Sequence, residues 1–144
     1  MMDQYRILKQ VFGYDSFRPG QKELVESLLA GRDVLGVMPT GAGKSICFQV
    51  PGLLLPGITL VSPLISLMRD QVNALVQAGV RGAFLNSSLT PAQYRKALSN
   101  ARQGIYKIIY VAPERLLTPD FLDFALSVNI SMVCVDEAHC VSQW

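Results

Sequence analysis

The sequence contains little histidine, little cysteine and almost no net charge. It has one histidine, and its three cysteines, Cys47, Cys134 and Cys140, form no Cys-x-x-Cys pair. Without a Cys-x-x-Cys pair, and with a single histidine, the sequence lacks the usual ligand spacing of a structural zinc site, and it favours a reducing compartment. Thirteen Lys and Arg residues face eleven Asp and Glu residues, for a formal charge of +2. That balance gives no general attraction for nucleic acid, so any such binding must come from local groups of residues.

Long apolar runs are also missing. The longest, at 50–55 and 58–61, are broken by proline, glycine or hydroxyl side chains, well short of the roughly 18 residues that a membrane-spanning helix needs. Residues 1–10 are too polar for a signal peptide. We therefore expect a soluble protein with no membrane partner, cytoplasmic and nucleoid-associated in a bacterium or nuclear in a eukaryote.

What the sequence does contain is a regular alternation of short β-rich runs and longer amphipathic stretches. Half of the 144 residues are apolar and 17% are charged, which suits strands covered on both faces. The alternation predicts an α/β fold with a parallel sheet flanked by helices. The expected strands are 34–38, 58–62, 82–86, 107–112 and 131–136, and two expected helices, about 5–12 and 19–30, precede the first of them.

Several dipeptides indicate where helices begin and end. A hydroxyl residue followed by proline is typical of a helix start, because the hydroxyl caps the free N–H groups and the proline fits the first turn. Gln93 is expected to complete a capping box with Thr90, and Gly31 and Gly79 stand where helices are expected to stop. The three predicted starts are Ser62-Pro63, Thr90-Pro91 and Thr118-Pro119.

The most specific motif is the phosphate-binding sequence at 38–45. Gly41 and Gly43 allow backbone N–H groups to approach a phosphate chain closely, because glycine has no side chain. Lys44 then supplies a cation for the outer phosphates, and Ser45 supplies a hydroxyl ligand for Mg²⁺. The motif is a variant, since Met38 replaces the usual first glycine. The alternative is a glycine turn that caps an ordinary helix.

A second motif follows the last expected strand. Four apolar residues at 132–135 lead to Asp136 and Glu137, at the carboxyl end of the strand, where open parallel sheets bind ligands. Asp136 is suited to hold Mg²⁺, and Glu137 to orient and deprotonate the attacking water. His139 is either a functional residue three positions later or an ordinary loop histidine. The alternative for the whole motif is a solvated strand end.

With these two motifs, the chain resembles the ATPase half of a superfamily 2 helicase. The flanking segments at 12–21, 62–71, 110–116 and 136–144 narrow the resemblance to the RecQ DNA helicases. The sequence at 136–139 alone would also suit an RNA helicase of the DEAH type. The resemblance implies a RecA-like fold and ATP-dependent 3′ to 5′ DNA unwinding with Mg²⁺, of the kind used in DNA repair and recombination.

The resemblance also implies an ATP site in two parts. In the adenine site, Gln21 would hydrogen-bond the base edge, and Tyr14 and Arg18 would stack on the ring. The alternative is that Tyr14 and Arg18 form a surface turn and that Gln21 is a solvated helix residue. The phosphate loop would comprise Met38, Pro39, Thr40, Gly41, Ala42, Gly43, Lys44 and Ser45.

The same resemblance implies contacts with single-stranded or partly duplex DNA. Hydroxyls, N–H groups at helix starts and arginines are suitable phosphate partners, and Trp144 offers a ring on which a base could stack. The alternative is that the hydroxyl and proline residues only cap helices. Arg95, Lys96 and Arg102 are expected on a solvated helix face. The expected DNA-binding residues are Ser62, Pro63, Arg69, Asn86, Arg115 and Trp144.

Relatives continue with a further strand, which in this fold lies between the two catalytic strands, and then with a second RecA-like domain. We therefore expect residues 1–144 to be an incomplete first RecA-like domain that is poorly stable and does not unwind DNA alone. Two other functions are considered: a nucleotide-binding module without catalysis, and a DEAH-type RNA helicase.

Overall fold

A computed structural model describes residues 3–32, 46–62, 72–85 and 89–135. The chain divides into two compact units, Met1–Pro56 and Gly57–Trp144. The expected strand at 34–38, the phosphate loop at 38–45 and the motif at 136–144 lie outside the described residues. Pro63, Arg69 and Asn86 lie outside them as well, and so does the helix start expected at Ser62-Pro63.

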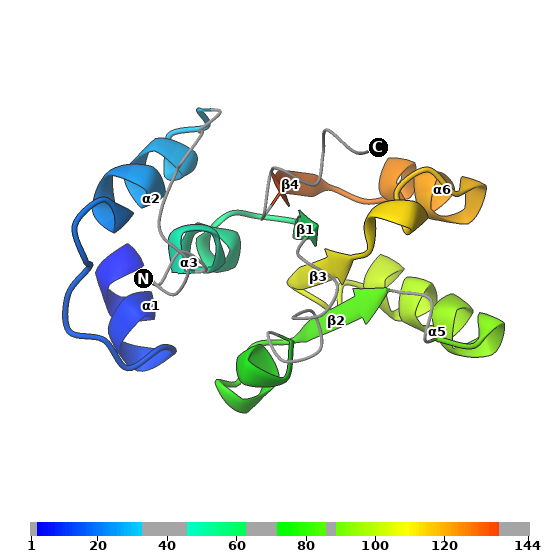
Figure 1. Cartoon of the computed structure of the whole chain (residues 1–144), viewed down its shortest axis with the longest axis horizontal. Coiled ribbons are helices and arrows are strands. Elements are labelled where there is room, and N and C mark those ends of the chain that lie inside the picture. The colour runs from blue at the N-terminus through cyan, green and yellow to red at the C-terminus, as the bar shows by residue number, and fades with distance from the viewer. Residues whose placement is uncertain (1–2, 33–45, 63–71, 86–88, 136–144) are drawn as a thin grey trace. The chain divides into compact units, whose positions relative to one another are not determined.

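The described residues of the first unit form three helices, α1 (Gln4–Gln10), α2 (Gln21–Leu29) and α3 (Ile46–Leu54) (Figure 1). Asp3 caps α1, because its carboxylate accepts a hydrogen bond from the N–H of Arg6 at 2.9 Å. Buried apolar side chains from all three helices form one cluster, which gives this unit its own core. The cluster consists of Ile7, Leu8, Val25, Ile46 and Val50.

The predicted ends of α2 are nearly right. The helix begins at Gln21, two residues after the expected Pro19, because Gly20 takes a left-handed conformation (φ 88°) as its N-cap. It ends at Leu29, and Gly31 follows with φ 82° and donates its N–H to the carbonyl of Leu28. A left-handed glycine in this position is a common helix stop, so that prediction is confirmed.

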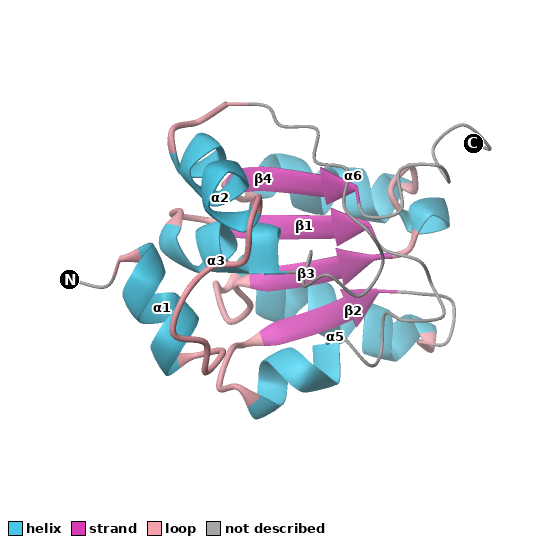
Figure 2. Ribbon diagram, turned by 60° about the vertical axis from the view of Figure 1, so that its left-hand side comes forward, coloured by secondary structure: helices cyan, strands magenta, loops and turns pink. Residues whose placement is uncertain are grey.

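The second unit is built on a parallel sheet of β1 (Ile58–Ser62), β2 (Gly82–Leu85), β3 (Ile108–Val111) and β4 (Ile130–Val135). Its strand order is β2-β3-β1-β4, and Figure 2 shows the four arrows pointing the same way. The predicted α/β fold with a parallel sheet and flanking helices is therefore confirmed. The expected strand at 58–62 agrees at both ends. The starts of the other three strands, and the end of the one expected at 107–112, differ by at most one residue, whereas the ends expected at 86 and 136 lie outside the described residues.

Two helices, α5 (Pro91–Arg102) and α6 (Pro119–Ser127), pack on one face of this sheet. Their apolar side chains meet those of alternate strand residues, as the two-residue period of a strand requires. A turn of 3₁₀ helix, η1 (Pro113–Arg115), links β3 to the segment that leads into α6. The buried cluster consists of Ile58, Leu60, Leu85, Tyr94, Leu98, Ala101, Ile109, Val111, Phe121 and Phe124.

The two predicted helix starts in this unit have different outcomes. At α5 the capping box is present: the Thr90 hydroxyl accepts from the N–H of Gln93, and the Gln93 side chain accepts from the N–H of Thr90. At α6, Thr118 is the N-cap residue, but its side chain makes no capping hydrogen bond. The hydroxyl instead donates to the carbonyl of Arg115 at 2.8 Å. The position was predicted correctly, and the role of the hydroxyl was wrong.

The strands differ in how well they are covered. All five residues of β1 are buried, since β1 lies between β3 and β4. By contrast, β4 pairs with β1 and, among the described strands, has no neighbour on its other side. Val133 and Val135 are 62% and 41% exposed, although both are apolar. In the described part of the chain, β4 is therefore an open sheet edge.

Candidate functional site

The four strands end at one edge of the sheet, which we call the carboxyl edge. There the register sets Ser62 beside Val135 and Val61 beside Tyr110. The segments that follow β1, β3 and β4 therefore start from neighbouring positions. This is the edge at which open parallel sheets bind ligands, and it is the edge from which Asp136 was predicted to extend.

Ser62 is the last residue of β1 and is 4% exposed. Its hydroxyl is buried and has no hydrogen-bond partner among the described residues. A buried hydroxyl without a partner is unusual, because its desolvation is then uncompensated. The structure thus puts Ser62 at the predicted edge, while its contact with DNA stays a prediction.

Arg115 stands at the same edge, beyond the end of β3. Its N–H donates to the carbonyl of Ala112 at 2.9 Å. The N–H of Ala112 in turn donates to the carbonyl of Leu85 at 2.9 Å, which ties the ends of β2 and β3 together. The Arg115 side chain is partly exposed, and its guanidinium carbon lies 4.6 Å from the centre of the Tyr94 ring. Ser62 and Arg115 are therefore both brought to the carboxyl edge.

The three residues predicted for adenine lie in the first unit, around the start of α2. Gln21 is 3% exposed, and its side-chain oxygen accepts from the N–H of Arg18 at 2.8 Å. The N–H of Gln21 donates back to the carbonyl of Arg18 at 3.0 Å. The amide group of Gln21 is therefore held in place by the loop.

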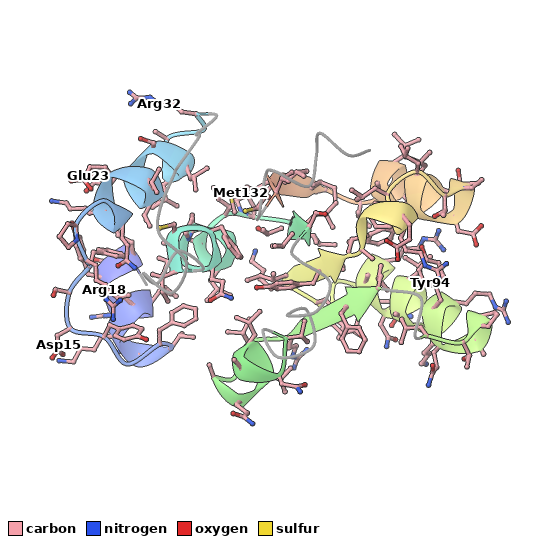
Figure 3. The ribbon with its side chains drawn as sticks, in the orientation of Figure 1. Asp15, Arg18, Glu23, Arg32, Tyr94 and Met132 are labelled. Atoms are coloured by element: carbon pink, nitrogen blue, oxygen red, sulfur yellow. The ribbon has the colours of Figure 1, made fainter. Side chains whose placement is uncertain are left out.

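Tyr14 and Arg18, by contrast, are exposed, and the Tyr14 residue is 49% accessible. Figure 3 shows Arg18 on the loop between α1 and α2, together with Asp15. Exposure suits a role in stacking on a ring, and it equally suits the surface turn considered above. Gln21 is different, because it is buried and not the solvated helix residue of the alternative interpretation.

The described neighbours of the two central motifs have the expected secondary structure. Helix α3 starts at Ile46, directly after the phosphate loop, and strand β4 ends at Val135, directly before Asp136. The roles of Lys44, Ser45, Asp136, Glu137, His139 and Trp144 stay predictions, because these residues lie outside the described part.

Two positions in the described residues have shifted pKa values, and neither belongs to the predicted site. Burial raises the pKa of the Cys47 thiol, an effect partly opposed by a backbone hydrogen bond. Burial also lowers the pKa of Lys107, whose ammonium donates to the carbonyl of Gly57 at 3.0 Å. Gly57 and Lys107 precede β1 and β3, so this contact lies at the amino edge of the sheet and is structural.

One residue at the carboxyl edge was not expected from the sequence. Tyr94 contacts Arg115 through its ring, yet the sequence offers no local signal for this, since the two residues lie on different elements. Among the described residues, no group of three acidic, histidine or cysteine side chains is placed to hold a metal ion. Nor is any helix of the described segments long and apolar enough to cross a bilayer.

Comparison with known proteins agrees with the geometry of a ligand-binding parallel sheet. Residues 18–144 match the DEAD/DEAH box helicase family. The chain is 49% identical over 141 residues to the ATP-dependent DNA helicase Q-like 5 of Arabidopsis thaliana, covering 96% of this chain and 15% of that protein.

Two bacterial proteins are similarly close. The ATP-dependent DNA helicase RecQ of Pasteurella multocida is 46% identical over 139 residues, covering 96% of this chain and 22% of that protein. The protein of the same name from Bacillus subtilis is 44% identical over 140 residues, covering 96% and 24%. The chain thus spans less than a third of the length of these curated relatives.

Proposed function

Since the chain belongs to the DEAD/DEAH box helicase family, we propose that it is the ATP-binding and ATP-hydrolysing half of a RecQ-type DNA helicase that moves 3′ to 5′ along single-stranded DNA. One observation supports this most strongly: proteins named as ATP-dependent DNA helicases share 44 to 49% of residues with this chain over 96% of its length. Such similarity extends far beyond the phosphate-binding motif that many ATPases share.

The phosphates of ATP would bind to the loop at 38–45. Gly41 and Gly43 would present N–H groups, and Lys44 would neutralise the outer phosphates. Ser45 and Asp136 offer a hydroxyl and a carboxylate, which are the hard oxygen ligands that Mg²⁺ prefers. Glu137 would accept a proton from the attacking water, and His139 would lie beside it. The start of α3 at Ile46 and the end of β4 at Val135 support this assignment.

The adenine base would bind at the start of α2. The Gln21 amide is already fixed by its hydrogen bond from the N–H of Arg18, so little further ordering is needed when a base arrives. Tyr14 and Arg18 are exposed and have the flat groups that stack on a ring. Buried Gln21 would thus read the base edge, and its exposed neighbours would hold the ring.

DNA would cross the carboxyl edge of the sheet. Arg115 and Ser62 support this proposal, because both lie at that edge. Charged and hydroxyl groups bind phosphates without regard to base sequence, as a translocating enzyme requires. Pro63, Arg69, Asn86 and Trp144 complete the proposed contacts.

The open edge of β4 supports the further proposal that residues 1–144 form part of a first RecA-like domain. Among the described strands β4 pairs only with β1, and a strand in that position leaves backbone N–H and C=O groups open to a further strand. A second RecA-like domain would then act on the same ATP. Such proteins would work in the bacterial nucleoid or the eukaryotic nucleus.

The proposal is tested by measuring ATP binding to the full chain with a fluorescent ATP analogue and Mg²⁺. Lys44→Ala removes a charged hydrogen bond to phosphate, so ATP should bind about 10- to 150-fold more weakly. Glu137→Gln should bind ATP normally and lose any hydrolysis that single-stranded DNA stimulates. Lys96→Ala, on the exposed side of α5, is the matched control and should match the wild type. Unchanged affinity in Lys44→Ala would contradict the proposal.

A second experiment compares ATP hydrolysis in the presence of DNA and of RNA oligonucleotides. The salt concentration is stated, because phosphate contacts depend on salt. Stimulation by DNA supports the RecQ assignment, whereas stimulation by RNA alone would indicate a DEAH-type RNA helicase. ATP binding that neither nucleic acid affects would indicate a nucleotide-binding module. Unwinding by the 144-residue chain is not expected, because a trans-acting arginine alone contributes about 10³- to 10⁵-fold in rate.

A further inference from the structure

We propose that Tyr94 is a positioning residue for DNA binding: its ring holds the guanidinium of Arg115 at the carboxyl edge of the sheet, ready to bind a backbone phosphate. This inference rests on the proposed function for the DNA contact of Arg115. It goes beyond that function by assigning a role to a buried aromatic residue of α5.

The Tyr94 ring is a rigid support. The residue is 4% exposed and belongs to the core cluster between the sheet and the helices α5 and α6. It lies on the side of α5 that faces α6 (Figure 3). It sits in the first turn of α5, where its N–H donates to the carbonyl of Thr90 at 2.9 Å. The capping box of Thr90 and Gln93 fixes this same turn. The ring therefore has little freedom to follow a moving partner.

Both the backbone and the side chain of Arg115 have contacts that restrict them. Its carbonyl accepts two hydrogen bonds from Thr118, from the hydroxyl at 2.8 Å and from the N–H at 3.2 Å. Its guanidinium carbon lies 4.6 Å from the centre of the Tyr94 ring, within the range of a cation–π interaction. The Thr118 hydroxyl, which was expected to cap α6, thus orders the backbone of the arginine instead.

This arrangement suits phosphate binding for a physical reason. A free arginine side chain loses much rotational freedom when it binds a ligand. Contact with a fixed ring restricts the guanidinium beforehand, and a guanidinium can donate two hydrogen bonds to one phosphate. Arginine held in this way should bind single-stranded DNA more tightly than a mobile arginine with the same charge.

Removing the Tyr94 hydroxyl tests the role of the ring separately from that of the polar group. It is buried and has no hydrogen-bond partner among the described residues, so it does not explain why tyrosine stands here. Tyr94→Phe keeps the ring and removes this hydroxyl. We expect it to bind DNA as the wild type does and to melt no lower, because a buried hydroxyl without a partner is destabilising.

The experiment measures the affinity of the full chain for a fluorescent oligothymidylate by anisotropy at several salt concentrations. Arg115→Ala should weaken binding and reduce the slope of log K against log salt by about 0.7, the value for one phosphate contact on a single strand. Tyr94→Leu keeps the site apolar without a ring and should weaken binding about two- to fivefold. Adding Tyr94→Leu to Arg115→Ala should cause no further loss.

Two controls match these variants. Tyr106→Leu changes a partly buried tyrosine against the same core cluster, just before the start of β3, and Arg102→Ala removes an exposed charge from the end of α5. Neither should weaken DNA binding as the paired variants do. If Tyr94→Leu does not fold, phenylalanines with increasing fluorination at position 94 replace it, because they keep the shape and weaken the negative face of the ring. DNA affinity should then fall stepwise while the melting temperature does not.

The outcomes distinguish this inference from the proposed function. If Arg115→Ala weakens DNA binding but Tyr94→Leu or the fluorinated series does not, the positioning role is wrong and the DNA contact stands. An additive loss in the double variant likewise overturns the inference, since Tyr94 would then act through the fold alone. If the wild-type chain binds no DNA, or if Arg115→Ala has no effect, the DNA contact itself fails and the inference fails with it.

Discussion

At the scale of single residues, the Cys47 thiol shows how burial controls reactivity. Cys47 is 7% exposed, and burial raises its pKa. The reactive species of cysteine is the thiolate, so a raised pKa and low access both slow its reactions. Because the pKa is higher in the folded state, the neutral thiol stabilises the fold below the unfolded pKa. That contribution is lost as the pH rises through the folded value.

We therefore predict that iodoacetamide labels Cys47 poorly in the native chain near neutral pH. Labelling should increase strongly in denaturant, and the chain should become less stable relative to Cys47→Ala as the pH rises above the usual thiol range. Peptide mapping by mass spectrometry measures this, with half-buried Cys134 as the internal comparison. Labelling of Cys47 as fast as that of Cys134 would contradict the prediction.

At the scale of elements, the entry into β1 depends on one glycine. Gly57 has φ 86°, a left-handed conformation that other residues rarely adopt. A Cβ atom here would also lie 2.5 Å from the carbonyl oxygen of Asn129. That carbonyl accepts the N–H of Ile58 at 2.9 Å, so the two chain segments cannot separate without losing a sheet hydrogen bond.

Gly57→Ala is accordingly expected to lower the free energy of unfolding by more than about 2 kcal/mol, from backbone strain and steric overlap together. Gly104→Ala is the matched control, because Gly104 has φ 79° and no atom within 4 Å of an added Cβ. It should cost only the conformational penalty, about 1 kcal/mol. Urea unfolding of both variants provides the measurement, and equal costs would show that the approach to Asn129 is unimportant.

At the scale of the whole molecule, we expect the edge that β4 forms among the described strands to limit stability. Exposed strand groups and apolar side chains such as Val133 add little to the free energy of unfolding, which for a complete domain is about 5 to 15 kcal/mol. We predict that the 144-residue chain melts over a broad temperature range, with weak near-ultraviolet ellipticity. A sharp cooperative transition with strong ellipticity would contradict this.

A pair of variants tests how well the side chains of β4 are covered. Val133→Thr changes a side chain that is 62% exposed, and Val61→Thr makes the same change at 0% exposure. The first should be nearly neutral, within about 0.5 kcal/mol, and the second should cost about 1 to 3 kcal/mol, because it buries a hydroxyl. A large cost at Val133 would show that another part of the molecule covers this strand.

The sequence by itself determined the local features of this protein. Strand 58–62, the capping box at Thr90 and Gln93, and the stop at Gly31 were all predictable. Each depends on hydrogen bonds within a few residues or on the alternation of apolar side chains. The family was predictable for the same reason, because its motifs are short and contiguous. These motifs also supplied the proposed roles of Lys44, Asp136 and Glu137.

The tertiary structure alone decided which distant residues meet. It placed β1 between β3 and β4. It also let the Thr118 hydroxyl donate to the carbonyl of Arg115, and it put the Tyr94 ring against the Arg115 guanidinium. No periodicity along the chain encodes such contacts, because they depend on how whole helices and strands pack. Sequence patterns specify which surface of an element is buried, whereas packing determines what that surface touches.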